Sequence, residues 1–173
     1  MSDTRAQALA LIAAAIERAV GVQATDTQLA IAFALLERRR RRRSARAVKT
    51  LNPTLRTRRD RSVAAAFPVL YHAAFAGAPV TVMVPTGELA GDDAALYRKI
   101  IDEIGAPTTV GTIKDARQAV ELQHAERDPV TIATPEALAA VAGHRSKIVV
   151  RLDPPATKRV TAMMPGTAGL PDL

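Results

Sequence analysis

The stretch Val80-Thr81-Val82-Met83-Val84-Pro85-Thr86-Gly87-Glu88-Leu89-Ala90 decides the fold of this chain. Its first five residues form an unbroken apolar and β-branched run, which is typical of a central strand in a parallel sheet covered on both faces. Pro85 ends the strand because it has no N–H to donate, and Thr86 is placed to cap a helix that follows directly. Ligands of open α/β sheets bind at the carboxyl ends of strands, so residues 84–89 are the first place to look for a site.

Strand-like and helical patterns alternate on the carboxyl side of this stretch, and helical patterns precede it. This order predicts an α/β fold with a parallel sheet of about five strands, right-handed crossovers and helices on both faces. The sequence predicts helices over residues 5–20, 26–36, 61–76, 88–104 and 115–126 and after Thr134, and further strands over 108–113, 130–133, 147–152 and 159–163. Residues 44–57 show no clear period.

The helix predicted over residues 88–104 has the clearest amphipathic pattern. Its expected buried stripe is Leu89, Leu96, Tyr97, Ile100 and Ile104, and its expected solvent face is Asp92, Asp93, Arg98, Lys99, Asp102 and Glu103. The helix predicted over 61–76 contains Pro68, which would kink it unless the helix begins near that residue. The helix over 26–36 is expected to turn Leu29, Phe33 and Leu36 toward the core.

The composition indicates one domain with an aliphatic core. The 173 residues are 48% hydrophobic but only 3% aromatic, so the core must be built from Ala, Val, Leu and Ile. The chain has no cysteine, which excludes disulfides, thiolate metal sites and a cysteine nucleophile and suits a cytoplasmic protein. The apolar stretch over residues 6–15 is too short to cross a membrane. The three histidines have no metal-ligand spacing, so no metal site is expected.

The positive charge is concentrated in one segment. Residues 38–61 hold 12 of the 24 Lys and Arg residues and one acid, so the remaining chain carries 12 basic and 16 acidic residues. Three interpretations stay open for this segment: a solvated insertion, a contact for nucleic acid, acidic protein or anionic lipid, and a nucleotide loop. The candidate anion-binding residues are Arg38, Arg39, Arg40, Arg41, Arg42, Arg43, Arg46, Lys49, Arg58 and Arg59.

Two strand ends resemble motifs of DEAD-box helicases. The segment Pro85-Thr86-Gly87-Glu88-Leu89 resembles the PTREL motif, and Ala133-Thr134-Pro135-Glu136-Ala137-Leu138 resembles the ATPGRL motif. In that family both motifs lie at strand ends of the first RecA-like domain. The resemblance therefore implies a three-layer RecA-like fold, with a helix, a strand and a helix between the two motifs.

Three further segments are similar to the nucleotide-binding domain of the protein-translocation motor SecA. Residues 25–29 are similar to its adenine-side DVQL segment, residues 56–63 to its phosphate loop RTGEGKTL, and residues 147–156 to its Walker B strand. The resemblance implies a nucleotide site at Gln28, Arg61, Ser62 and Asp153. It also implies a degenerate SecA- or DEAD-like domain over residues 25–164 with a basic insertion at 38–61, after an N-terminal helix over 1–24 and before a flexible tail over 165–173. On the residues alone, Gln28 also fits a helix cap and Asp153 a plain strand-end acid.

The phosphate-binding chemistry of this family is altered here. No glycine lies between Gly21 and Gly77, and Arg58, Arg59, Asp60 and Arg61 stand where the family has the Gly-Glu-Gly-Lys whose backbone N–H groups wrap phosphate. Asp153 is followed by Pro154, so the acid that would polarise water is missing. We expect no cofactor and no ATPase activity, and interpret the chain as a binding or regulatory module for a protein partner or a polyanion (RNA, DNA or an anionic membrane surface). The alternatives are a nucleotide-binding ATPase or helicase-type fragment completed by a partner chain, and an RNA- or DNA-binding protein that uses the arginine segment.

Overall fold

A computed structural model of the chain describes residues 2–37, 47–50, 55, 57–113, 129–140 and 148–151. The helices are α1 (Ser2–Val20), α2 (Asp26–Glu37), α3 (Arg58–Leu70), the π-helical turn η2 (Tyr71–Phe75), α4 (Gly87–Ile104) and α6 (Pro135–Ala140). The strands are β1 (Ala47–Thr50), β2 (Val80–Met83), β3 (Val110–Ile113), β4 (Val130–Ala133) and β5 (Ile148–Arg151). The helix expected over 115–126, the strand expected over 159–163 and the tail lie outside the described residues.

The described strands form one parallel sheet in the order β1-β5-β2-β4-β3. The predicted α/β class with a parallel sheet is therefore confirmed, and β2 lies inside the sheet as its apolar run predicted. The strands end level with one another, since Met83 is paired with both Ala133 and Arg151, and Arg151 with Thr50. The helices that follow β1, β2 and β4 consequently begin near one edge of the sheet.

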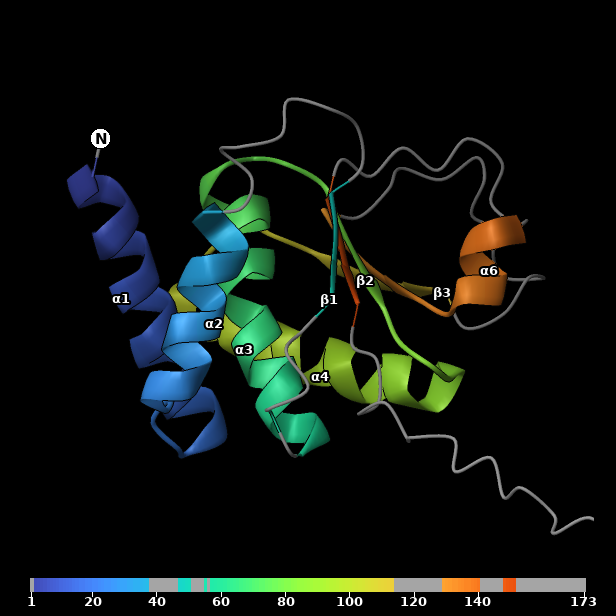
Figure 1. Cartoon of the computed structure of the whole chain (residues 1–173), viewed down its shortest axis with the longest axis horizontal. Helices are drawn as coiled ribbons and strands as arrows, with labels where there is room; N and C mark the ends of the chain where they lie inside the picture. The colour runs from blue at the N-terminus through green and yellow to red at the C-terminus, as the bar shows by residue number, and fades with distance from the viewer. Residues whose placement is uncertain are drawn as a thin grey trace, which may run out of the picture.

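Helices α3 and α4 lie on the same face of the sheet. They connect β1 to β2 and β2 to β3, two crossovers that run in the same direction along the sheet. Right-handed crossovers in one direction place both helices on one face, whereas α6 follows β4, from which the chain returns to β5, and belongs to the other face. Figure 1 shows α1 to α4 gathered on one side of the strands and α6 on the other. Helix α1 packs on α4, and α2 packs on α3.

Strand β1 was not visible in the sequence pattern. Residues 44–57 show no clear period, yet Ala47–Thr50 pairs along its whole length with β5. The strand is four residues long and contains Lys49, so it presents neither an apolar run nor a full alternation. Strand β1 is stabilised by pairing with the apolar strand β5, which lies more than one hundred residues away in the sequence and which no local pattern reveals.

Helix α3 begins at Arg58, three residues before the predicted start, and contains Pro68. Proline has no N–H for the helical ladder, and here the α-helix ends two residues after it, at Leu70. The chain then continues as the π-helical turn η2, with Ala76 as its C-cap, so a wider helical turn follows the α-helix that contains the proline. Gly77 follows with a left-handed φ of 57°, a conformation that glycine adopts without steric cost.

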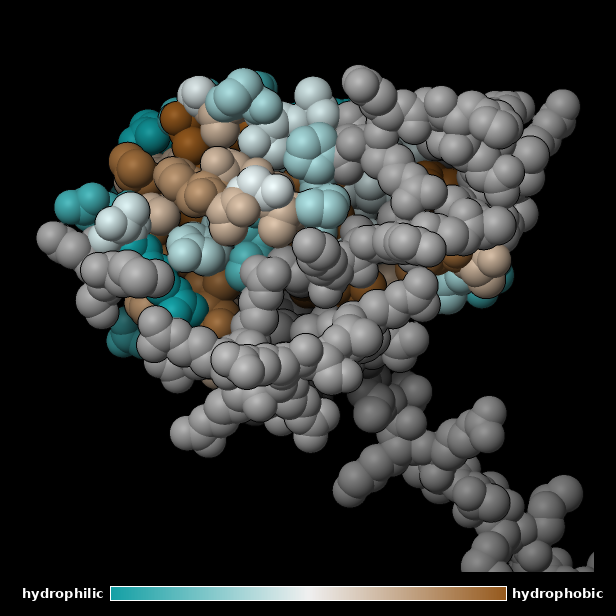
Figure 2. Space-filling view, turned by 90° about the horizontal axis from the view of Figure 1, so that it is seen from above, coloured by the Kyte–Doolittle hydropathy of each residue, from teal (hydrophilic) through white to brown (hydrophobic). Residues whose placement is uncertain are grey.

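The core is aliphatic, as the composition predicted, and Phe67 and Tyr97 are its largest fully buried side chains. The expectation that Phe33 faces the core was wrong, because Phe33 is 46% exposed. The inward stripe of α2 is Gln28, Ala32 and Leu36, a strict i, i+4 spacing, and Phe33 lies one position beyond it. Exposed apolar residues are interspersed with hydrophilic ones on the coloured part of the face seen in Figure 2. No helix in the described part of the chain is long and apolar enough to cross a membrane.

Candidate functional site

The N-terminus of α3 lies inside the segment that the SecA resemblance assigns to the phosphate loop, because the helix begins at Arg58 and that segment spans residues 56–63. Thr57 caps it in an extended conformation, and its Oγ1 accepts a hydrogen bond from the Asp60 N–H at 3.1 Å. The Thr57 N–H donates in return to Asp60 Oδ2 at 3.2 Å, which completes a capping box. The Asp60 carboxylate therefore occupies the positive end of the helix dipole.

Gln28 joins the first turn of α2 to the first turn of α3. Its Oε1 accepts a hydrogen bond from the Thr25 N–H at 2.8 Å, and its own N–H donates to Thr25 Oγ1 at 3.3 Å. Its Nε2 lies 3.4 Å from both the backbone oxygen and Oδ1 of Asp60. The structure thus brings together two segments that the resemblance assigned to one site, although both ends of the Gln28 amide are already engaged.

Arg61 and Ser62, the other described residues of the expected nucleotide site, point into the protein. Arg61 is 6% exposed and donates from Nη1 to the Leu55 carbonyl at 3.0 Å. Ser62 is 1% exposed, and its hydroxyl donates to Asp93 Oδ1 at 2.8 Å. Asp153 lies outside the described residues. Neither Arg61 nor Ser62 presents its side chain to an open phosphate position.

Asp93 is buried, so the expectation that it stays in solvent was wrong. Its side chain is 2% exposed, and its Oδ2 accepts a hydrogen bond from Arg58 Nη2 at 2.7 Å. The same Arg58 nitrogen also donates to the Leu89 carbonyl at 3.0 Å. Burial raises the pKa of the Asp93 carboxyl above its ordinary value, while the Ser62 hydrogen bond and the Arg58 charge act in the opposite direction.

Sequence spacing contained a signal for Asp93. The residue lies four positions after Leu89 and four before Tyr97, which places it on the same helical stripe as those apolar residues. Tyr97 is fully buried beside this network, and its hydroxyl donates to the Ser62 carbonyl at 3.4 Å. Burial also raises the pKa of Tyr97 well above its ordinary value. An acid on an apolar stripe indicates a buried ion pair whose partner must come from another helix.

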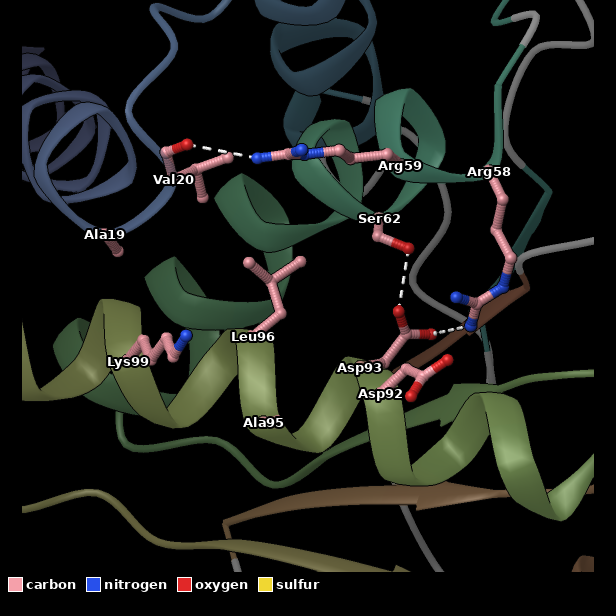
Figure 3. Close-up of a pocket in the computed structure, with 10 residues that line it drawn as sticks. All are labelled: Ala19, Val20, Arg58, Arg59, Ser62, Asp92, Asp93, Ala95, Leu96 and Lys99. Carbon is pink, nitrogen blue, oxygen red and sulfur yellow. Dashed lines mark hydrogen bonds and ion pairs between the residues drawn. The ribbon is translucent and has the colours of Figure 1, made fainter.

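A pocket of about 500 Å³ opens beside this network, between α1, α3 and α4. It is lined by Ala19, Val20, Arg58, Arg59, Ser62, Asp92, Asp93, Ala95, Leu96 and Lys99. Figure 3 shows Leu96 projecting from α4 into the space beneath the Arg59 side chain, with Lys99 on one side and the two aspartates on the other. Arg59 spans from α3 to α1, where its Nη2 donates to the Val20 carbonyl at 3.0 Å.

Two of the candidate anion-binding residues, Arg58 and Arg59, line this pocket and also hold parts of the fold together. Lys49 lies in β1, between Val48 and Thr50. The remaining candidates, Arg38 to Arg43 and Arg46, lie outside the described residues. Among the described residues, the structure brings Arg58 and Arg59 to one pocket together with Lys99, a residue that sequence reasoning placed only on a solvent face.

Comparison with family models, curated proteins and solved structures found no match to this chain. Within the described ranges, no group of three or more His, Asp or Glu side chains is arranged to hold a metal ion. The functional assignment therefore rests on the geometry of α3, α4 and their neighbours.

Proposed function

We propose that this chain is a SecA- or DEAD-box-like RecA-type domain whose nucleotide site is closed by its own side chains, and that it acts as a non-catalytic binding or regulatory module. Two features support the family: the parallel sheet with helices between its strands, and the contact of Gln28 with the first turn of α3. The contact of Gln28 joins residues that are 32 positions apart in the sequence. The resemblance requires these two segments to lie close together, and no local sequence pattern would bring them together.

The proposed loss of nucleotide binding rests on the N-terminus of α3, which is occupied by side chains of the protein itself. A phosphate group bound there would be repelled by the negative charge of the Asp60 carboxylate. That carboxylate already accepts hydrogen bonds from the Thr57 backbone N–H and from Gln28 Nε2. The Ser62 hydroxyl, which stands where the family presents a Mg²⁺ ligand, is buried and bonded to Asp93 instead. Opening the site would break these hydrogen bonds and leave the Asp93 carboxylate buried with fewer partners, which is costly.

In this proposal the binding function belongs to surfaces outside the nucleotide position. A protein partner or a polyanion would contact the basic segment over residues 38–61, and chiefly its arginine run Arg38 to Arg43, which follows α2. A nucleotide-binding fragment that a partner chain completes is the competing function. The competing function requires that the chain bind ATP when Mg²⁺ is supplied, and this requirement distinguishes it from the proposed non-catalytic module.

Equilibrium binding of ATP·Mg²⁺ by calorimetry, together with steady-state phosphate release, tests the proposal on the full chain. We expect no Mg²⁺-dependent binding of ATP, and turnover below about 1 s⁻¹, the low end of typical enzymes. Mg²⁺-dependent ATP turnover above that rate, lost in Asp153→Asn but kept in the surface control Asp102→Asn, would overturn it. Asp102 is an exposed acid of α4 and does not line the pocket, so its substitution matches the charge change without touching the site.

A further inference from the structure

The pocket between α1, α3 and α4 has more cationic than acidic side chains in its lining. Arg58, Arg59 and Lys99 line it together with two acids, Asp92 and Asp93. The Asp93 carboxylate in its wall is already engaged by Arg58 and Ser62. Asp92 is the other acid in the lining, and within the described residues neither it nor Lys99 has a hydrogen-bond or ion-pair partner.

The two ends of the pocket differ in charge. Asp92 and Lys99 are seven residues apart on α4, so their backbone positions are separated by about 10 Å along the helix axis. Asp92 lies at the Arg58 end, while Lys99 lies at the end where Arg59 reaches the Val20 carbonyl. The Arg59 guanidinium has one hydrogen bond to described residues, through Nη2, which leaves further donors for a ligand. An incoming negative charge is therefore favoured at the Arg59–Lys99 end.

The middle of the pocket is apolar. Leu96 projects into the space between the two charged ends, and Ala95 on α4 and Ala19 on α1 add apolar surface to the lining. The volume of about 500 Å³ is within the range of small-molecule sites, which combine apolar walls with a few polar groups that fix orientation. A ligand that fits both features has a small apolar body and an oxyanion at one end.

We propose that this pocket binds a small organic oxyanion, a phosphate monoester or a carboxylate, with the anionic group held by Arg59 and Lys99 and the apolar body on Leu96. This site lies beside the N-terminus of α3 and shares Arg58, Arg59 and Ser62 with the segment that the resemblance assigns to the phosphate loop, but an anion held by Arg59 and Lys99 does not require the proposed function. Arginine and lysine together suit an oxyanion because their N–H donors make charge-assisted hydrogen bonds to it.

Titration of the ¹⁵N-labelled full chain with phenyl phosphate and with benzoate tests the proposal. An amide-resolved readout is needed because the ten Lys and Arg residues of segment 38–61 other than Arg58 and Arg59 could also attract these anions. We expect saturable shifts centred on residues 19–20, 59 and 95–99 for at least one of the two probes. The neutral probe benzyl alcohol should bind about tenfold more weakly or worse, because it lacks the charge. A preference between phenyl phosphate and benzoate identifies which oxyanion the site takes.

Substitution of Lys99 separates this site from general attraction of anions. We expect Lys99→Gln to weaken binding about tenfold and Arg18→Gln, an exposed α1 cation outside the lining, to change it by less than about twofold. Lys99 is exposed, so the variant should keep the wild-type melting temperature. Shifts confined to residues outside the pocket, equal binding of benzyl alcohol, or equal affinities of Lys99→Gln and the unaltered chain would each overturn the proposal.

Discussion

Substitution of Arg58 by methionine should destabilise the protein in a pH-dependent way. Arg58 is the cationic partner of Asp93, and the side chains are 28% and 2% exposed respectively. Removal of one partner of a buried ion pair costs about 3–5 kcal/mol, and partial access of water to the Arg58 position favours the lower end, about 3 kcal/mol at pH 7. For a chain of this length, that loss lowers the melting temperature by roughly 6–12 °C.

The pH dependence follows from the raised pKa of Asp93. The folded state keeps the Asp93 proton to higher pH than the unfolded chain, so this carboxyl favours folding below its ordinary pKa, about 3.8, and that contribution is lost as the pH rises through the folded pKa. The Arg58 charge lowers the pKa of Asp93, so its removal raises that pKa further. The cost of Arg58→Met should therefore be smallest near pH 4, where Asp93 is neutral in the variant, and largest near pH 7.

Urea unfolding at several pH values measures this effect, with Arg18→Met as the matched control. Arg18 forms an exposed ion pair with Glu103, with side chains 54% and 40% exposed, and such pairs contribute less than about 1 kcal/mol. In the double variant with Asp93→Asn, the pH dependence caused by Arg58→Met should disappear. The reasoning is refuted if Arg58→Met costs the same at pH 4 and pH 7, or no more than Arg18→Met.

Three further perturbations test other parts of the structure. Val82→Asp places an unpaired charge in a fully buried position of β2 and should prevent cooperative folding, which circular dichroism melting would show. Thr57→Ala removes the cap of α3 and should lower the unfolding free energy by about 1 kcal/mol, with Thr86→Ala at the start of α4 as a comparison of similar size. Replacement of Arg38 to Arg43 by Gln should flatten the salt dependence of binding to RNA or anionic vesicles with little change in melting temperature; an unchanged salt slope would exclude these arginines as the contact.

The fold class could be predicted because β2 and α4 carry strong local signals. An apolar run that ends at Pro85 and is followed by a threonine cap defines a buried strand and the start of a helix without long-range information. The structure confirms both, including the Thr86 cap, and it ends α4 with a left-handed C-cap at Gly105, where φ is 69°. Thr134 likewise caps α6, as its Oγ1 accepts a hydrogen bond from the Ala137 N–H at 3.2 Å.

The candidate site was less predictable because its residues come from helices far apart in the sequence. The pairing of Asp93 with Arg58 and Ser62 depends on how α3 and α4 pack, and no spacing within either helix specifies the partner. The pocket adds a third element, the C-terminal end of α1. Only the position of Asp93 on an apolar stripe was available in advance, and it was assigned to the solvent face because aspartate is rarely buried.

The position of β1 in the sheet has a consequence for how the chain folds during synthesis. In the described sheet its neighbour is β5, and the paired residues Ala47 and Ile148 are separated by 101 positions. At translation rates of about 5–20 residues per second, Ala47 is added to the growing chain roughly 5–20 s before Ile148. Helices α1 to α4 and strand β2 can assemble in that interval, while β1 has not yet been joined by its neighbouring strand β5. Docking of β5 between β1 and β2 is then the late step that closes this part of the sheet, and it is slow because of its large loop-closure entropy.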